Sequence, residues 1–206
     1  MATECLKQLT KFNDMRTIFA LLLFIFSTQF SLAQLIKKYV ASPIRCETSW
    51  TGSAAFSSYQ LTGTIPIKSG QVIIKDGWIQ AGVIEFNVAQ IQHEEKNLVN
   101  HLKSEDFFAV KDYPFSQFEF TEPCEIIEGK VMAIGELTIR DHKKSEQFEV
   151  SVVFIGEQMI CTFSCTINRV EYGITHNSPS LFKDLKDDAI ADEFTLQSKV
   201  FFHLAE

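Results

Sequence analysis

An alternation of apolar and polar side chains with a period of two constrains the fold of this chain more than any other feature. Within 147–154 the residues at 148, 150, 152 and 154 are apolar, and similar alternation runs through 117–121, 162–167 and 194–203. Successive side chains of a strand point to opposite faces, so this period is typical of strands with one buried face. We predict a chain made mostly of β-sheet.

Short turns separate the predicted strands. Glycine or aspartate interrupts the alternation at 69–70, 76–77, 128–129, 140–142 and 156–157. The pair at 76–77 is Asp-Gly, which is typical of a two-residue hairpin turn. Many strands joined by tight turns form a sandwich or a barrel. Long strands in consecutive hairpins favour an up-and-down barrel, which leaves no exposed edge, so we predict a barrel in preference to a sandwich.

Two segments depart from the strand pattern. In 94–104 Leu98 and Leu102 lie one turn apart, which predicts a helix. Two phenylalanines at 107–108 follow, and we expect this helix and its aromatic tail to lie across one mouth of the barrel. The irregular stretch 178–188 also has apolar residues at helical spacing, and we expect it to shield the other side.

The first 33 residues have the parts of a secretory signal peptide. Arg16 precedes the apolar run Ile18–Phe26, and small residues precede an expected cleavage after Ala33. Met15 is an alternative start. An uncleaved membrane anchor is the other interpretation, but polar residues dilute the run, and spanning needs about 20 apolar residues. No cysteine directly follows Ala33, so we expect a soluble product, periplasmic or secreted, without a lipid anchor.

The remaining residues, 34–206, are enough for one domain with its own core. They carry 16 basic and 24 acidic side chains, a net charge of −8, because the leader removes three basic and two acidic residues. Nucleic acids and anionic membranes bind basic surfaces, so neither is an expected partner. Cys161 and Cys165 lie four residues apart in one predicted strand, about 13 Å, too far for a disulfide. Free buried thiols are the preferred state of the cysteines, although other pairings stay open.

Motifs that carry chemistry are missing from the sequence. It has no Gly-x-Ser-x-Gly elbow, His-Glu-x-x-His pair or phosphate-binding glycine loop, and its five histidines are scattered. We therefore expect no catalytic residue, metal or cofactor. His101 is expected to form hydrogen bonds on a helix face, with a role near the barrel mouth as the alternative. For Arg169 a structural ion pair and a ligand contact are equally favoured.

A resemblance to a known family rests mainly on one segment. His101–Phe108 (HLKSEDFF), followed by Tyr113-Pro114 and Phe118, closely resembles the YceI-like family pattern HLKSxDFFDxxxYPxxxF. Weaker matches occur in the right order: WTG at 50–52, KSG at 68–70, GELTI at 135–139, and NR and YGI within 168–174. The chain departs from the family at LTG 61–63, AGVI 81–84 and Asn87, where many members carry His-x-Gly, Gly-Gly and Asp.

This resemblance implies an all-β, eight-stranded antiparallel up-and-down barrel, lipocalin-like, with one or two short helices near its mouth. It also implies export and an elongated apolar pore for a polyisoprenoid or similar long lipid. The departures include the loss of a polar group near the pore, which weakens the expectation of head-group recognition more than that of chain binding.

Nineteen phenylalanines either fill such a barrel or line a hollow in it. We predict a carrier that binds a long apolar lipid without reacting with it. A solid structural or interaction barrel and a lipid-modifying enzyme are the alternatives, and a homodimer stays open. The predicted ligand contacts are Trp50, Phe86, Phe107, Phe108, Phe118, Phe120, Phe163, Arg169, Tyr172 and Phe182.

Overall fold

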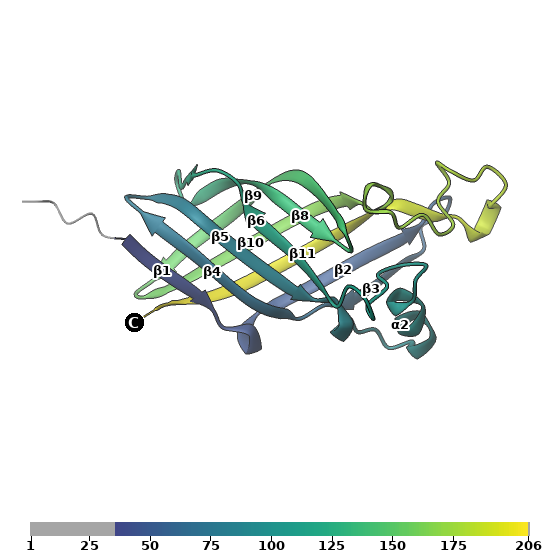
Figure 1. Cartoon of the computed structure of the whole chain (residues 1–206), viewed down its shortest axis with the longest axis horizontal. Coiled ribbons are helices and arrows are strands. Elements are labelled where there is room, and N and C mark those ends of the chain that lie inside the picture. The colour runs from purple at the N-terminus through teal and green to yellow at the C-terminus, as the bar shows by residue number, and fades with distance from the viewer. Residues whose placement is uncertain (1–35, 206) are drawn as a thin grey trace, which may run out of the picture. The chain divides into compact units, whose positions relative to one another are not determined.

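The computed structural model describes residues 36–205, which form an antiparallel barrel with one α-helix beside it (Figure 1). The strands are β1 (Ile36–Ala41), β2 (Glu47–Ala54), β3 (Gln60–Thr64), β4 (Ile67–Lys75), β5 (Trp78–Asn87), β6 (Phe115–Phe120), β7 (Cys124–Glu125), β8 (Lys130–Ile139), β9 (His142–Ile155), β10 (Gln158–Asn168) and β11 (Ile190–Leu204). The helix is α2 (Lys96–Lys103), and short 3-10 turns are η1 (Pro43–Arg45), η2 (Val88–Gln90), η3 (Arg169–Tyr172) and η4 (Lys186–Asp188).

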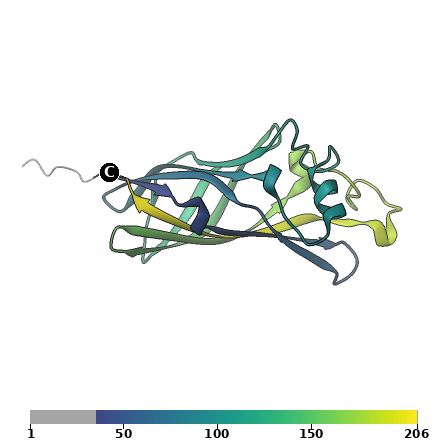
Figure 2. The ribbon, with the colours of Figure 1, turned by 90° about the horizontal axis from the view of Figure 1, so that it is seen from below.

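The strand order closes the sheet into a ring. Neighbours run β1-β4-β5-β6-β8-β9-β10-β11, and β11 pairs back to β1. The long strand β11 has two partners on that side. Residues 202–204 pair with β1, and residues 190–199 pair with β2, which in turn pairs with β3. Three pairs of segments each form one strand of the barrel: β2 continues β1, β4 continues β3, and β7 continues β6, since both pair with β5. The eleven segments therefore form eight strands. The predicted antiparallel barrel is confirmed (Figures 1 and 2).

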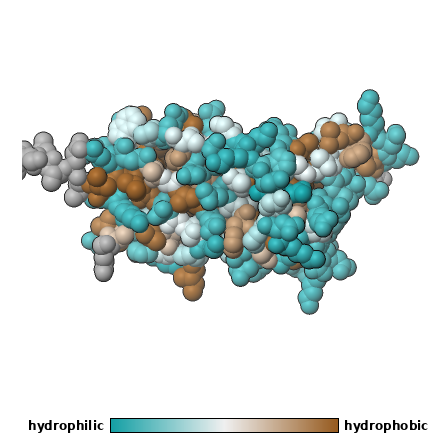
Figure 3. Space-filling model, in the orientation of Figure 1, coloured by the Kyte–Doolittle hydropathy of each residue, from teal (hydrophilic) through white to brown (hydrophobic). Residues whose placement is uncertain are grey.

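Alternation along the strands places apolar side chains inside the ring. In β8 the buried residues are Val131, Ala133, Gly135, Leu137 and Ile139, and the residues between them are more exposed. The outer face is correspondingly hydrophilic over much of the side seen in Figure 3, with separate apolar areas. The hydrophobic effect therefore fixes which face of each strand turns inward.

Two-residue turns connect the strands where the sequence predicts them. Asp76 and Gly77 both have positive φ, 52° and 82°, as do Glu128 and Gly129, at 50° and 75°. Turns with two positive φ values match the twist of the flanking strands. The predicted turn at 69–70 is wrong, since these residues lie inside β4.

Gly70 has a packing role instead of a turn role. A Cβ at this position would lie 3.1 Å from Cβ of Ala41, so the absence of a side chain lets β4 pack closely against its neighbours. The register between β4 and β5 also shifts between Ile67 and Ser69. Glycine in a strand marks a close approach or bulge as readily as a turn, which explains the error.

The predicted helix at 94–104 is confirmed as α2, and its Leu102 is buried. The segment 178–188 forms only the short turn η4 at its end. Its start is tied to β11, because Ser178 Oγ donates to Asp192 Oδ1 at 2.6 Å and the Ile190 N–H donates to the Asn177 carbonyl. These contacts with β11, rather than helical hydrogen bonds, hold the start of the segment.

The predicted signal peptide, residues 1–33, lies outside the described residues. Across 36–205, no helix is both long enough and apolar enough to cross a membrane. The four cysteines in this part of the chain are free thiols: Cys46, Cys124, Cys161 and Cys165.

Candidate ligand-binding site

An apolar cavity of ≈ 300 Å³ occupies the end of the barrel next to α2. Its walls come from inward residues of the strands, from α2 and the aromatic segment after it, and from residues 188–191. We call it the mouth chamber, and its apolar lining includes Leu61, Ile65, Val88, Ile91, Leu98, Leu102, Ile139, Ile174, Ile190 and Phe194. Pockets of this kind hold small apolar molecules.

A second, smaller cavity lies deeper in the barrel. This inner chamber has a volume of ≈ 40 Å³ and is lined by residues such as Val72, Ile79, Val131, Val150 and Phe202. Three rings fill most of the space here: Phe118 and Phe148 have centroids 5.0 Å apart, and Phe148 and Phe163 are 5.1 Å apart. These are ordinary aromatic packing distances.

The two chambers share part of their walls. Phe86, Leu137, Ile167 and Leu196 line both, and we call these four residues the neck. The two chambers therefore adjoin each other inside the ring, with the neck residues as their common wall. Ile167 belongs to a segment whose alternation already pointed it inward, so strand facing would have found it.

Eight of the ten residues predicted as ligand contacts line one of the chambers. Four line the mouth chamber only: Trp50, Phe107, Phe108 and Arg169. Three line the inner chamber only: Phe118, Phe120 and Phe163. Phe86 lines both. Their contact with a ligand stays a prediction. The prediction named aromatic residues and overlooked the aliphatic side chains that make most of the lining.

Tyr172 and Phe182 line neither chamber, so their predicted place in the lining is wrong. Tyr172 is completely buried in η3, and its hydroxyl donates to Glu146 Oε1 at 2.6 Å. Burial, together with this bond to Glu146, raises the pKa of the Tyr172 hydroxyl. Phe182 is 51% exposed, because the segment that carries it is not a helix packed on the barrel.

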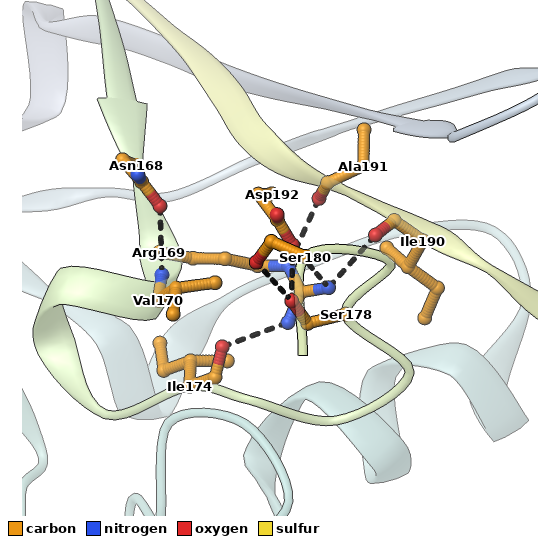
Figure 4. Close-up of polar contacts among 9 residues, drawn as sticks. All are labelled: Asn168, Arg169, Val170, Ile174, Ser178, Ser180, Ile190, Ala191 and Asp192. Carbon is orange, nitrogen blue, oxygen red and sulfur yellow. Dashed lines mark hydrogen bonds and ion pairs between the residues drawn. The ribbon is translucent and has the colours of Figure 1, made fainter. Parts of the chain in front are cut away.

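Arg169 is buried, and its side chain donates hydrogen bonds to backbone carbonyls around it (Figure 4). Its Nε donates to the Ala191 carbonyl at 2.9 Å, its Nη1 to the Ile174 carbonyl at 2.7 Å and its Nη2 to the Ile190 carbonyl at 2.9 Å. Nη2 also lies 3.8 Å from Oδ1 of Asp192. All three nitrogens are therefore engaged by the protein.

These contacts favour the structural interpretation of Arg169 over direct ligand recognition. The side chain joins the segment after β10 to the start of β11, and so shapes the wall of the mouth chamber. Burial lowers the pKa of Arg169, and nearby Asp192 opposes that effect. Burial alone would raise the pKa of Asp192, but bonds from Ser178 and Ser180 and the charge of Arg169 lower it overall.

Trp50 offers a hydrogen-bond donor that the protein does not use. Its ring lines the mouth chamber, and its Nε1 is buried without a partner among residues 36–205. Gly63 makes room for the ring, since a Cβ there would lie 2.5 Å from Cζ2 of Trp50. A buried donor without a partner costs about 1–3 kcal/mol. Nε1 itself is shielded from the chamber, so the part of Trp50 that lines the chamber is its apolar ring.

The inner chamber holds two thiols but no activated nucleophile. Cys161 and Cys165 both line it. Burial raises the pKa of each thiol to about 12, with Glu146 adding to the effect on Cys165. Both thiols are therefore protonated near neutral pH, and a protonated thiol is a poor nucleophile.

Comparison with known proteins agrees with this architecture. A family model described as a YceI-like domain matches residues 39–202. Two UPF0312 proteins from strains of Staphylococcus epidermidis are 33% identical over 120 residues, which cover 52% of this chain and 66% of theirs. The chain thus matches just under two thirds of the length of these relatives.

Two solved structures share the fold. BcnA from Burkholderia cenocepacia has a TM-score of 0.65 at 17% identity, with 78% of this chain and 98% of that one covered. A polyisoprenoid-binding domain from Saccharophagus degradans, implicated in plant cell wall breakdown, has a TM-score of 0.62 at 8% identity, with 81% and 98% covered. At these identities the likeness concerns the fold alone. Because the family model spans the barrel from β1 into β11, this chain belongs to the YceI-like family.

Proposed function

We propose that this protein is an exported carrier that binds a long apolar lipid, of the polyisoprenoid type, non-covalently inside the barrel. The observation that carries the proposal is the pair of adjoining apolar chambers inside the barrel, which share the neck as a common wall. A structural neighbour described as polyisoprenoid-binding supports the same class of ligand. Export rests on the signal-peptide features of residues 1–33, and a periplasmic or secreted location is part of the proposal.

The lining indicates how such a lipid would lie. The inner chamber is walled almost wholly by apolar side chains, whereas the mouth chamber also includes Ser53, Asp188 and Glu193. Burying a polar group without a partner is costly. The polar end of the lipid would therefore stay at the mouth, with the tail pointing toward the neck.

The expected affinity is moderate. A tail that buries roughly 400 Å² gains about 10 kcal/mol at about 25 cal/mol per Å². Association costs of about 4–15 kcal/mol offset much of this gain. Chain length should consequently matter more than the exact chemistry of the chain.

Binding without reaction is the form of the proposal that the chambers support. Their lining is apolar, the thiols of Cys161 and Cys165 are held protonated, and the guanidinium of Arg169 is occupied by backbone carbonyls. A carrier should return its lipid unchanged, whereas an enzyme should return a product. Incubation with a defined polyisoprenoid, followed by extraction and mass spectrometry, separates the two.

The direct test is to fill the neck and look for lost lipid. Leu137→Trp places a large ring between the chambers, so the protein should co-purify with little lipid and bind an added polyisoprenoid at least tenfold more weakly. Met132→Trp is the control, because Met132 lies on the same strand β8 but is 49% exposed. Native mass spectrometry measures both, and circular dichroism checks folding.

Equal lipid content in the two variants would contradict the proposal. So would purified protein that contains no apolar molecule and binds none when one is added, a result that would favour a structural or interaction barrel.

A further inference from the structure

Three potential metal ligands meet beside the mouth chamber. His101 on α2, Asp106 just after it and His176 in the segment after η3 place their ligand atoms within 4.8 Å of one another. His101 Nε2 is 3.4 Å from Asp106 Oδ2, and His176 Nδ1 is 3.9 Å from the same oxygen. The sequence showed these histidines as scattered, because only the fold brings His176 to the helix.

We propose that His101, Asp106 and His176 bind a divalent transition-metal ion, with Zn²⁺ as the best fit. Imidazole nitrogens with a carboxylate oxygen are a common zinc ligand set. Zinc–ligand bonds of about 2.0–2.1 Å in a tetrahedron separate neighbouring ligand atoms by about 3.3 Å. One pair already has this separation, and small side-chain rotations bring the third atom in.

The surroundings keep the ligands near one another and accessible. The two imidazole rings contact each other edge to face, with centroids 4.8 Å apart, and His101 packs on Phe107 in the same way at 4.9 Å. Arg140 Nη1 donates to the carbonyls of Phe107 and Gly173, so it already holds together the two segments that carry the ligands. The ligand side chains are between 29% and 58% exposed, so an ion can reach them from solvent.

A bound ion would fix one wall of the mouth chamber. Leu102 and Phe107, next to His101 and Asp106, line the chamber, and so does Ile174, two residues before His176. The metal would cross-link these two parts of the lining through three protein ligands, with a further position open to water or an anionic oxygen. If the lipid-carrier function proposed above holds, the ion should slow lipid release, and that consequence rests on the earlier proposal.

The test is a zinc titration of metal-free, lipid-free protein by calorimetry. We expect one saturable site, at least tenfold weaker in His176→Ala and in Asp106→Asn. Asp106 is exposed, so Asp106→Asn should fold normally even if a histidine variant does not. His203→Ala is the matched control, since His203 lies on β11 and bonds to Ser42 away from α2, and it should bind zinc like the unaltered protein.

Two further readouts distinguish the proposed site from adventitious binding. Co²⁺ in the same site should show the visible absorption of a tetrahedral complex, and this absorption should disappear in His176→Ala. Zinc at about 100 times its dissociation constant should raise the melting temperature by about 5 °C or more, and the shift should disappear in Asp106→Asn.

No saturable zinc binding, or binding that both variants retain in full, would overturn the metal site and leave the carrier proposal intact. Zinc binding by a protein that takes up no lipid would instead overturn only the carrier proposal. The lipid release rate with and without zinc then tests the link between the two.

Discussion

The two halves of the barrel interior are built by the same strands but differ in their contents. The mouth chamber is ≈ 300 Å³ and lined mainly by aliphatic side chains, whereas the inner chamber is ≈ 40 Å³ and occupied by packed phenylalanine rings. Strands β8, β10 and β11 contribute to both. The difference shows that side-chain size decides where this barrel is hollow, while the backbone decides only that it is closed.

The halves also differ in what holds their walls. The inner half depends on apolar packing around Phe118, Phe148 and Phe163, within a continuous ladder of strands. At the mouth, Arg169 and Arg140 bind backbone carbonyls of the irregular segments and of the start of β11. Ligand capacity therefore depends on polar contacts at one end and on ring volume at the other.

Replacing Arg169 tests the polar half and should have the largest effect. Arg169→Met leaves the carbonyls of Ile174, Ile190 and Ala191 without their donor and Asp192 without its cation. Breaking a buried charged contact of this kind costs about 3–5 kcal/mol. Urea denaturation should show that loss, and Lys183→Met, at an exposed position, should show almost none. A loss below about 1 kcal/mol would mean that the wall does not depend on this arginine.

Removing a ring tests the packed half. Phe148→Ala should enlarge the inner chamber and, since Phe148 is only partly buried, cost about 2 kcal/mol, below the range for a fully buried phenylalanine. The longest polyisoprenoid that binds with full affinity should become longer by about one isoprene unit. A series of chain lengths measured by displacement of a fluorescent lipid gives this limit. An unchanged limit would show that the tail does not pass the neck.

Alkaline pH tests how dry the inner half is. Burial raises the pKa of Cys161 and Cys165 to about 12, so the unfolded chain loses these protons at lower pH than the folded protein. The thiols make their full contribution to the free energy of unfolding below the unfolded-state pKa of about 8.5–9. This contribution falls as pH rises above that value. Between pH 8 and pH 10 the loss should be about 1.5 kcal/mol per thiol.

The double variant Cys161→Ala, Cys165→Ala isolates this effect from other groups that titrate in the same range. Its unfolding free energy should fall less steeply between pH 8 and pH 10 than that of the unaltered protein. Parallel curves would mean that the thiols are hydrated in the folded state.

The smallest effect concerns Trp50 at the mouth. Trp50→Phe keeps an aromatic ring but removes the N–H. Because Nε1 is shielded from the chamber, a lipid with an oxygen at its head and a pure hydrocarbon of the same length should lose affinity by the same small factor. Calorimetric titration with both ligands gives the comparison. A larger loss for the lipid with the oxygen would show that the N–H turns into the chamber when lipid binds.

The architecture could be predicted from the sequence because the patterns that indicate it lie within short segments of the chain. Alternation, the Asp76-Gly77 turn and the spacing of Leu98 and Leu102 depend on neighbouring residues, and the structure confirms the strands, hairpin and helix that they predict. The predicted turn at Gly70 failed because glycine serves close packing as well as turns.

Positions in the site were harder to predict because they depend on contacts between distant segments. Tyr172 is aromatic and next to the late family motif, yet η3 turns it toward Glu146 on β9. Arg169 finds its partners on β11 and the loop before it, and His176 meets α2 only in the folded chain. No periodicity within one segment contains this information.

The closure of the ring has a consequence for how the protein reaches its folded state. Tyr39 on β1 pairs with Leu204 on β11, so the first and last described strands are neighbours. Contacts between residues so far apart form slowly, because a long loop must close first. Until β11 is in place, the strands β1, β2 and β10 each lack a neighbour, and unpaired strand edges favour aggregation. Folding of this barrel should therefore be slow and vulnerable until its final strand joins.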